Sequence, residues 1–354
     1  MEDNEEIENN HSEDIIIVNE DGFNNCLIGF NYDEKPREVF PPIIDYYKYR
    51  YYITKDSDPK NNDKFKEKVE KSLLKFKLEE HLKSLNINLP KEDNNNEEEI
   101  KFEKIKSNCC PFDEYGIIQN WDDMEFIWRE IFSKKLGVSP EKHNIILTEG
   151  INNTKENRKK MGEIMFETFH TPKLFIAKKL ALPLFSQYSK TGLMVDFGND
   201  KITIAPIFEG YCLLPIEIFE IPSHSPFFQP NIIEKVSNII CKYDFDLRKE
   251  LISCIYLYGT PSRIERISDQ LSHKYYYMYG SSKKNPGISE QFTKIIQGLI
   301  PSCYEYVNVK ILPENTFPIW EGALQLSNML SKTDWISKNE YEEIGSDIIN
   351  RKCF

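Results

Sequence analysis

The segment Leu193–Tyr211 (LMVDFGNDKITIAPIFEGY) carries a carboxylate at the end of an apolar run, beside a turn. Its two apolar runs predict strands, and residues 198–201 (GNDK) predict the turn between them. A tight turn can direct several backbone N–H groups at one anion, and a carboxylate at the strand end, here Asp196, can hold hydrated Mg²⁺. The segment therefore predicts a phosphate and magnesium site, although an ordinary hairpin has the same pattern.

Residues 196–198 (DFG) also match the metal-binding motif of protein kinases. A kinase needs in addition a glycine-rich G-x-G-x-x-G loop, a V-A-I-K strand and an H-R-D loop upstream. The sequence contains none of these three motifs, so we exclude a kinase.

A second strand–turn–strand pattern lies near the N-terminus. The apolar run 15–18 (IIIV) is followed by the turn residues 19–22 (NEDG) and by another apolar run at 26–30 (CLIGF). Two such hairpins that faced each other across a cleft would hold a triphosphate from both sides. The pair is a stronger indication of a nucleotide site than either hairpin alone.

The charge balance and the cysteines restrict the function classes. The 354 residues include 45 Lys and Arg and 57 Asp and Glu, and this net charge of -12 argues against non-specific nucleic-acid binding. No apolar run approaches the ~20 residues that span a bilayer, and the acidic start MEDNEEIENNHSED lacks a secretory-signal pattern. The eight cysteines and six histidines show no C-x-x-C or zinc-ligand spacing, so we expect a reduced intracellular protein without a metal cage.

Alternating helices and strands must position the hairpins, and this alternation is typical of an α/β fold with mixed sheets. The C-terminal tail 317–354 is predicted to be helical, with turns at Gly322 and Gly345. Trp121, Trp128, Met165 and Phe169 are expected in the core, and Met161 and Ile164 share a helix face with the last two. The other predicted elements are helices over 120–137, 153–170 and 230–256 and strands over 144–150 and 193–207.

Two segments differ in composition from the rest. Residues 1–14 hold seven acids and no Lys or Arg, which predicts a disordered, self-repelling tail. Residues 55–108 are polar, with a low-complexity stretch at 91–99. They enclose an amphipathic helix at 65–85 whose apolar stripe would pack within the protein or bind a partner.

Several blocks resemble actin, in actin's order, and together cover more than half of the chain. The block 146–172, from ILTEG through NRKKMGEIMFETFHTP, is the most specific, and the similarity is closer to conventional actin than to distant actin-related proteins. The other blocks are Gly29-Phe30 with PREVFP (36–41), YGIIQNWDDMEFIW (115–128), PIFEGY (206–211) and the C-terminal WISKNEYEEIGSDIINRKCF.

The resemblance implies an actin-like α/β fold of the ribonuclease H-like or Hsp70 ATPase type, in a truncated form, with two related lobes around a cleft for ATP or ADP with Mg²⁺. It also implies a cytoplasmic, cytoskeletal location and, as partners, actin or other actin-family subunits and cytoskeletal regulatory proteins. The first large lobe would comprise 15–47, 109–190 and 320–354, and the second 191–319, with 48–108 as a charged insert in place of one small lobe.

The resemblance also assigns site residues, and here the sequence departs from actin. Phe23 replaces a hydroxyl donor, and Leu27 replaces the lysine that reaches the phosphates, a loss of about 1.5–3 kcal/mol. Asp200 and Thr260 stand where glycines are expected, so they would repel or crowd the nucleotide. The assigned cofactor positions are Glu20, Asp21, Gly22, Asp196, Gly198, Asn199 and Gly259, with Glu20 and Asp196 holding Mg²⁺ through water.

The residues that position the attacking water in actin are a glutamine and a histidine, and Glu163 and Thr203 take their places here. Glu163 could act as a general base, but its charge would repel a triphosphate. We therefore expect at most a weak ATPase.

A large segment of actin has no counterpart in this sequence. After residues 206–221 the chain passes to FFQPNII (227–233), which matches a much later part of actin. The small lobe between them, which closes one side of the cleft, is expected to be missing, and an open cleft would bind nucleotide weakly. The sequence leaves two functions open: a filament subunit or filament-associated protein with a degraded cleft, or a nucleotide-free interaction module that caps filament ends.

Overall fold

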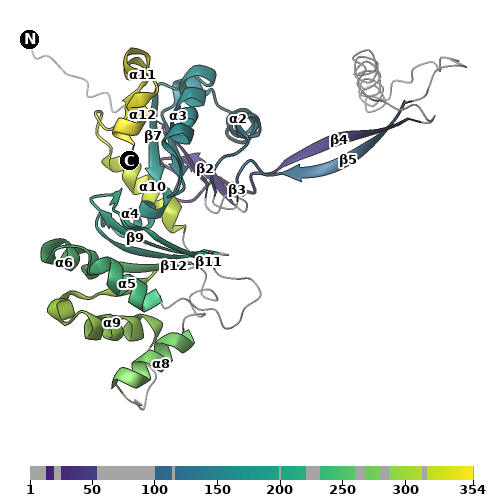
Figure 1. Ribbon diagram of the computed structural model, residues 1–354. Helices are drawn as coiled ribbons and strands as arrows, with labels where there is room; N and C mark the ends of the chain where they lie inside the picture. Colours follow the sequence, from purple (N-terminus) through teal and green to yellow (C-terminus); the bar gives the residue numbers. More distant parts are fainter. Residues whose placement is uncertain are drawn as a thin grey trace, which may run out of the picture. The chain divides into compact units, whose positions relative to one another are not determined.

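The chain folds as two compact units, Ile43–Cys110 and the combination of Met1–Pro42 with Pro111–Phe354. The computed structural model describes residues 13–19, 25–53, 100–113, 116–198, 201–220, 232–259, 268–279, 287–312 and 317–353. For 44–53, 100–109, 220 and 268–270 it describes the backbone alone. The expected helix at 65–85 and most of the acidic tail lie outside these residues. Figure 1 shows the elements in chain order.

The first sheet of the larger unit has six strands around a buried hairpin. β1 pairs antiparallel with β2, and β1, β6 and β7 run parallel to one another. The two strands predicted on either side of the first turn, and the strand predicted at 144–150, are thereby confirmed. In sheet order the strands are β14 (Ile336–Ser337), β7 (Lys173–Lys178), β6 (Ile145–Glu149), β1 (Ile15–Asn19), β2 (Cys26–Phe30) and β3 (Glu38–Phe40).

The second sheet repeats the same plan. β8 and β9 form an antiparallel hairpin, and β8, β12 and β13 run parallel to one another. The hairpin expected at 193–207 is therefore confirmed. In sheet order the strands are β10 (Tyr211–Cys212), β9 (Lys201–Phe208), β8 (Gly192–Phe197), β12 (Ile255–Gly259) and β13 (Val309–Ile311), and β11 (Glu217–Glu220) also pairs with β9.

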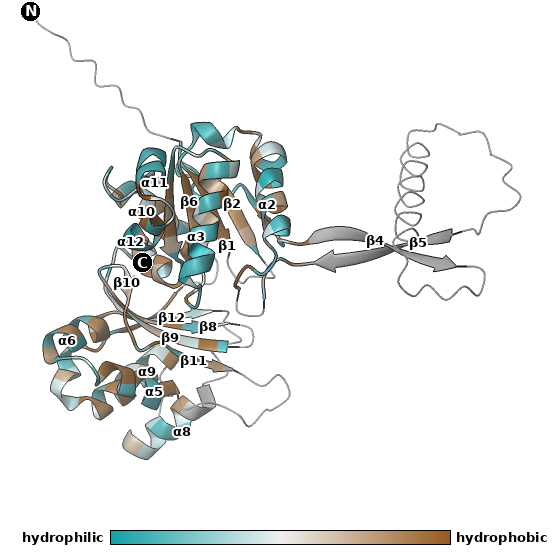
Figure 2. Ribbon diagram, turned by 45° about the horizontal axis from the view of Figure 1, so that its top comes forward, coloured by the Kyte–Doolittle hydropathy of each residue, from teal (hydrophilic) through white to brown (hydrophobic). Residues whose placement is uncertain are grey.

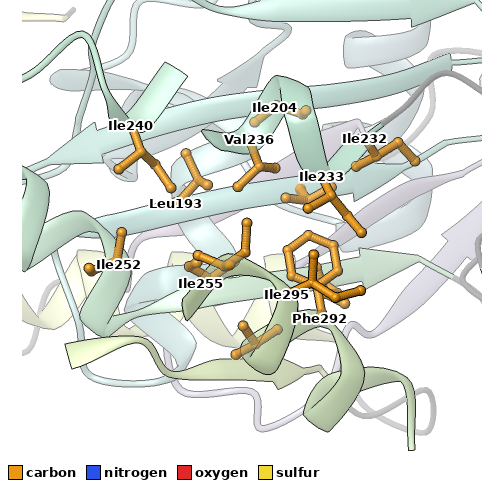
Figure 3. Close-up of a cluster of buried hydrophobic side chains, with 14 of the residues drawn as sticks. Leu193, Ile204, Ile232, Ile233, Val236, Ile240, Ile252, Ile255, Phe292 and Ile295 are labelled. Atoms are coloured by element: carbon orange, nitrogen blue, oxygen red, sulfur yellow. The ribbon is translucent and has the colours of Figure 1, made fainter. Parts of the chain in front are cut away.

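Helices cover one face of the second sheet and bury its larger apolar cluster. Side chains from β8, β9 and β12 meet those of α5 and α9 there, as Figure 3 shows for Leu193, Val236 and Phe292. The strands alternate, so residues 193, 195 and 197 of β8 all face this cluster. The helices are α5 (Ile232–Ile240), α6 (Phe245–Ser253), α8 (Ser268–Tyr279) and α9 (Ile288–Leu299), followed by the short η6 (Pro301–Tyr306).

The prediction of one helix over 230–256 is wrong. The chain forms α5 and α6 with a turn between them, and then the strand β12. Asp244 begins α6, because its side chain accepts a hydrogen bond from the backbone N–H of Leu247 at 2.9 Å. Because the chain turns between α5 and α6, each helix can direct its own apolar face at the sheet independently.

The helices of the first sheet confirm the local signals in the sequence. Asn120 caps α2 by accepting from the N–H of Asp123, and Gly137 ends the helical segment at φ 67°. Met161 and Met165 are buried, as the predicted stripe requires. Figure 2 shows the brown strands inside and the mixed helices outside. These helices are α2 (Trp121–Glu130), η1 (Ile131–Leu136), η2 (Pro140–Lys142), α3 (Lys155–Glu163), η3 (Ile164–Thr168), α11 (Lys338–Ile344) and α12 (Asp347–Lys352).

A second apolar cluster joins the two sheets through η4 (Lys179–Ala181), α4 (Leu182–Ser186) and α10 (Pro318–Met329). The prediction of a turn at Gly322 is wrong, because this glycine lies inside α10. A Cβ on Gly322 would lie 1.8 Å from the carbonyl oxygen of Leu182, so the glycine allows the two helices to touch. Gly345, by contrast, ends α11 at φ 81°, as predicted.

Asp14 corrects the expected extent of the acidic tail. It is buried, and its carboxylate accepts hydrogen bonds from Asn31, Asn144 and Ser327 at 3.2, 2.8 and 3.1 Å. Burial of a carboxylate requires such partners. Asp14 therefore belongs to the folded unit and holds the start of β1.

In the described part of the unit Ile43–Cys110, β4 (Ile44–Ile53) and β5 (Ile100–Cys109) form a two-stranded antiparallel ribbon. Its ten residue pairs run without a bulge from Ile44 opposite Cys109 to Ile53 opposite Ile100. None of the helices among the described residues is long and apolar enough to cross a membrane.

Candidate functional site

Asp196 lies near the carboxyl end of β8, in the middle of the second sheet. Its neighbours in register are Thr203 on β9 and Tyr258 on β12, and all three residues are half-buried. Alternation places them on the sheet face of Met194, which belongs to the cluster between the two sheets. The predicted metal-binding carboxylate therefore sits at a strand end on the face toward the first sheet.

Two glycines lie at the carboxyl ends of the adjacent parallel strands β8 and β12, Gly198 just after β8 and Gly259 as the last residue of β12. Gly259 has φ 138°, and a Cβ there would lie 2.7 Å from the carbonyl oxygen of Phe197. A Cβ on Gly198 would lie 3.0 Å from the carbonyl oxygen of Lys201. Position 259 requires glycine because of its positive φ and because a Cβ would collide with the carbonyl oxygen of Phe197. The adjacent carboxyl ends of parallel strands are where α/β sheets commonly bind ligands.

Phe197 contributes nothing polar to this site. Its ring is 1% exposed and lies in the apolar cluster with Ile202 and Leu257. The side chain therefore stabilises the end of the hairpin from the opposite face of the sheet. Only its backbone is left to contact a ligand.

The first hairpin is described on both sides of its turn. Glu20, Asp21 and Gly22 lie outside the described residues, as does Asn199 in the second hairpin. Leu27 of β2 is fully buried and packs in the cluster between the sheets. The position at which the resemblance to actin implies a phosphate-binding lysine is thus part of an apolar core.

Asn19, the last residue of β1, has a buried side-chain oxygen without a hydrogen-bond partner among the described residues. Its backbone N–H donates to Thr148 Oγ1 at 2.9 Å, while its side-chain Oδ1 is buried and no hydrogen-bond donor of the described chain reaches it. A buried acceptor without a partner is costly. A donor such as a metal-bound water would satisfy it, which makes Asn19 a candidate for a ligand contact at the first hairpin.

A buried charge cluster at the carboxyl ends of β6 and β7 was missed in the sequence. Glu149 is 5% exposed and pairs with Lys178 at 2.6 Å and with Arg158 Nε at 2.9 Å. Arg158 also donates to the backbone oxygen of Cys353 at 2.8 Å, which ties the C-terminal segment to the cluster. The available signal is that Glu149 and Lys178 are charged residues that follow the apolar parts of their strands.

Glu163 ends α3 and forms an ion pair with Lys160 at 3.2 Å. Its side chain is 34% exposed. An i,i+3 partner on the same helix is an ordinary surface arrangement. A role for Glu163 as a general base stays a prediction.

The thiols near the hairpins do not supply a reactive group. Burial raises the pKa of Cys26 and of Cys212 to about 12, so both remain protonated at neutral pH. Within the described residues there is no group of three or more His, Cys, Asp or Glu that could hold a metal ion.

The actin family model matches residues 11–222 and 215–354, which together include both hairpins and both sheets. The chain belongs to the actin family. Its α/β fold with two mixed sheets is the fold of that family. The hairpins β1–β2 and β8–β9 occupy equivalent positions in its two sheets.

Proposed function

We propose that this chain is a cytoskeletal protein of the actin family that works as a filament subunit or binds filaments, with a weakened Mg-ATP cleft. The match to the actin family over both halves supports the cytoskeletal part. The observation that carries the weakened cleft is Leu27, an apolar residue fully buried between the sheets where the family resemblance implies a phosphate-binding lysine.

The described residues of the two hairpins fit a hydrated magnesium ion in part. Asp196 supplies a carboxylate at a strand end, and the orphaned Oδ1 of Asn19 would accept a hydrogen bond from a metal-bound water. Gly198 and Gly259 allow a close approach of backbone to phosphate. A bound Mg²⁺ would neutralise phosphate charge, and Asp196 would orient its water shell.

The absence of one small lobe is part of the proposal. β11 ends at Glu220 and α5 begins at Ile232, so only residues 221–231 separate them. Such a segment is far shorter than the roughly 50 residues of a small domain. The two family matches also overlap at 215–222, close to the point in the sequence where we propose that the segment for that lobe is missing.

The experiment is calorimetric titration of the purified protein with Mg-ATP, and with Mg-ADP for comparison. We expect weak binding, because the loss of a charge-assisted phosphate contact lowers affinity roughly 10- to 150-fold. Asp196→Ala should abolish the binding heat. The control Asp122→Ala removes an exposed carboxylate of α2 and should leave the heat unchanged.

Leu27 provides a second arm of the same experiment. Leu27→Lys should tighten Mg-ATP binding about tenfold if the side chain reaches the phosphates, whereas Leu27→Met preserves burial without charge and should change nothing. Unaltered binding in Asp196→Ala would remove that residue from the site. No heat with millimolar ATP in the wild type would favour the second candidate, a nucleotide-free end-cap.

A further inference from the structure

We propose that the ribbon β4–β5 is a docking surface for an acidic, extended segment of a partner protein, which pairs with the ribbon as a third strand. The inference does not depend on nucleotide binding. It rests on the sheet to which the ribbon belongs, on the register of its residues and on its charge.

The ribbon forms a sheet with two free edges among the described strands. β4 and β5 pair with each other over ten residues, and no other described strand joins them. In an antiparallel pair, alternate residues of each strand direct their N–H and C=O groups away from the partner. Both edges can therefore accept another strand, which an isolated two-stranded ribbon needs for stability.

Aromatic and basic residues are arranged in rows by the register. Tyr47, Tyr49 and Tyr51 alternate along β4, so they share one face at intervals of roughly 7 Å. Lys106 stands opposite Tyr47, and Lys104 opposite Tyr49. The register sets these two lysines on one face of the ribbon, and acidic residues at the matching positions of an added strand would be of opposite charge.

The ribbon differs in charge from the rest of the chain. It holds five Lys and Arg (Lys48, Arg50, Lys101, Lys104, Lys106) and two acids (Asp45, Glu103), a net charge of +3. The whole chain has 45 basic and 57 acidic residues, so the residues outside the ribbon carry -15. A local basic surface on an acidic protein selects an acidic partner.

The observations favour a polypeptide over a nucleic acid and over a second ribbon. A peptide can pair with the free backbone edges, which a nucleic acid cannot do in this way. A polyanion would also be repelled by the -15 of the remaining chain more strongly than a short acidic segment. Two copies of the ribbon carry +3 each and repel one another.

The test is fluorescence anisotropy with the full-length protein and a labelled eight-residue peptide of alternating Glu and Val. We expect saturable binding that weakens as salt rises. The same peptide N-methylated at every residue should not bind, because neither edge of its backbone can then donate hydrogen bonds to the ribbon. A peptide of alternating Lys and Val should also fail to bind.

The decisive variant is Lys104→Glu with Lys106→Glu, which should lower the affinity at least about tenfold. The control is Lys142→Glu with Lys332→Glu, two exposed lysines of the other unit that give the same change in net charge. Lys104→Gln with Lys106→Gln, which adds no acid, should give a smaller loss of affinity.

Three results would overturn the proposal. The acidic peptide could fail to bind, it could bind the variant and the wild type equally, or its N-methylated form could bind as well as the parent. A single-stranded oligothymidine probe that bound where the peptide did not would identify the ribbon as a nucleic-acid surface instead.

Discussion

Arg158 shows how one side chain can join segments that are distant in the sequence. It links Glu149 at the end of β6 to the backbone oxygen of Cys353, while Lys178 binds Glu149 from β7. All three charged side chains are at most 9% exposed. A buried charge that loses its partner is much more costly than a surface charge.

We predict that Arg158→Met lowers the free energy of unfolding by about 3–5 kcal/mol, since Glu149 keeps one cation and the oxygen of Cys353 loses its donor. Urea denaturation at neutral pH measures the change. Arg129→Met is the matched control, because Arg129 is 57% exposed in its ion pair with Glu125. It should cost less than about 1 kcal/mol. Equal losses in the two variants would contradict a special role for the buried cluster.

At the scale of elements, the C-terminal helices are held by a capping arrangement around Glu340. Its carboxylate accepts from the backbone N–H of Ser337 at 2.9 Å and from Lys352 Nζ at 2.7 Å. Lys352 also donates to the backbone oxygen of Trp335 at 2.8 Å. These bonds join α11, α12 and the strand β14, so they fix the end of the chain against the first sheet.

The bonds from Lys352 and from the N–H of Ser337 lower the pKa of Glu340 below its usual value. A lowered pKa stabilises the fold above the unfolded pKa of about 4.3, and this contribution is lost as pH falls through the folded pKa. Glu340→Gln should therefore lower the melting temperature at neutral pH, and the difference should shrink below about pH 4.

Thermal melts of both proteins across this pH range measure the effect. Glu343→Gln, on the same helix and exposed, should leave the melting temperature nearly unchanged at every pH. A loss in Glu340→Gln that did not depend on pH would show that packing, and not charge, is responsible.

For the whole molecule, the question is how this actin-family chain meets a filament. Labelled protein should co-sediment with preformed actin filaments in Mg-ATP, because the proposed function places this actin-family chain in or on a filament. Single-filament fluorescence microscopy then separates the two candidate functions. Label along the filament would support a subunit or side-binding protein, and label at one end with arrested growth would support an end-cap. Absence of both would contradict the proposed function.

Some features were determined by the sequence itself, because they depend on neighbours a few residues away. Asn120 and Gly137 set the ends of one helical segment through local hydrogen bonds and a positive φ. The two hairpins follow from short apolar runs on either side of polar turns. The blocks shared with actin identified the fold for the same reason, since they are continuous stretches of sequence.

Other features were decided only by the tertiary structure, because they depend on which distant residues meet. Gly322 has the appearance of a turn residue, yet the contact with Leu182 places it inside a helix. Leu27 could be recognised in the sequence as a missing lysine, but only the packing of the two sheets showed that its site is an apolar core. Arg158 and Cys353 lie far apart in the sequence, and no local pattern encodes their contact.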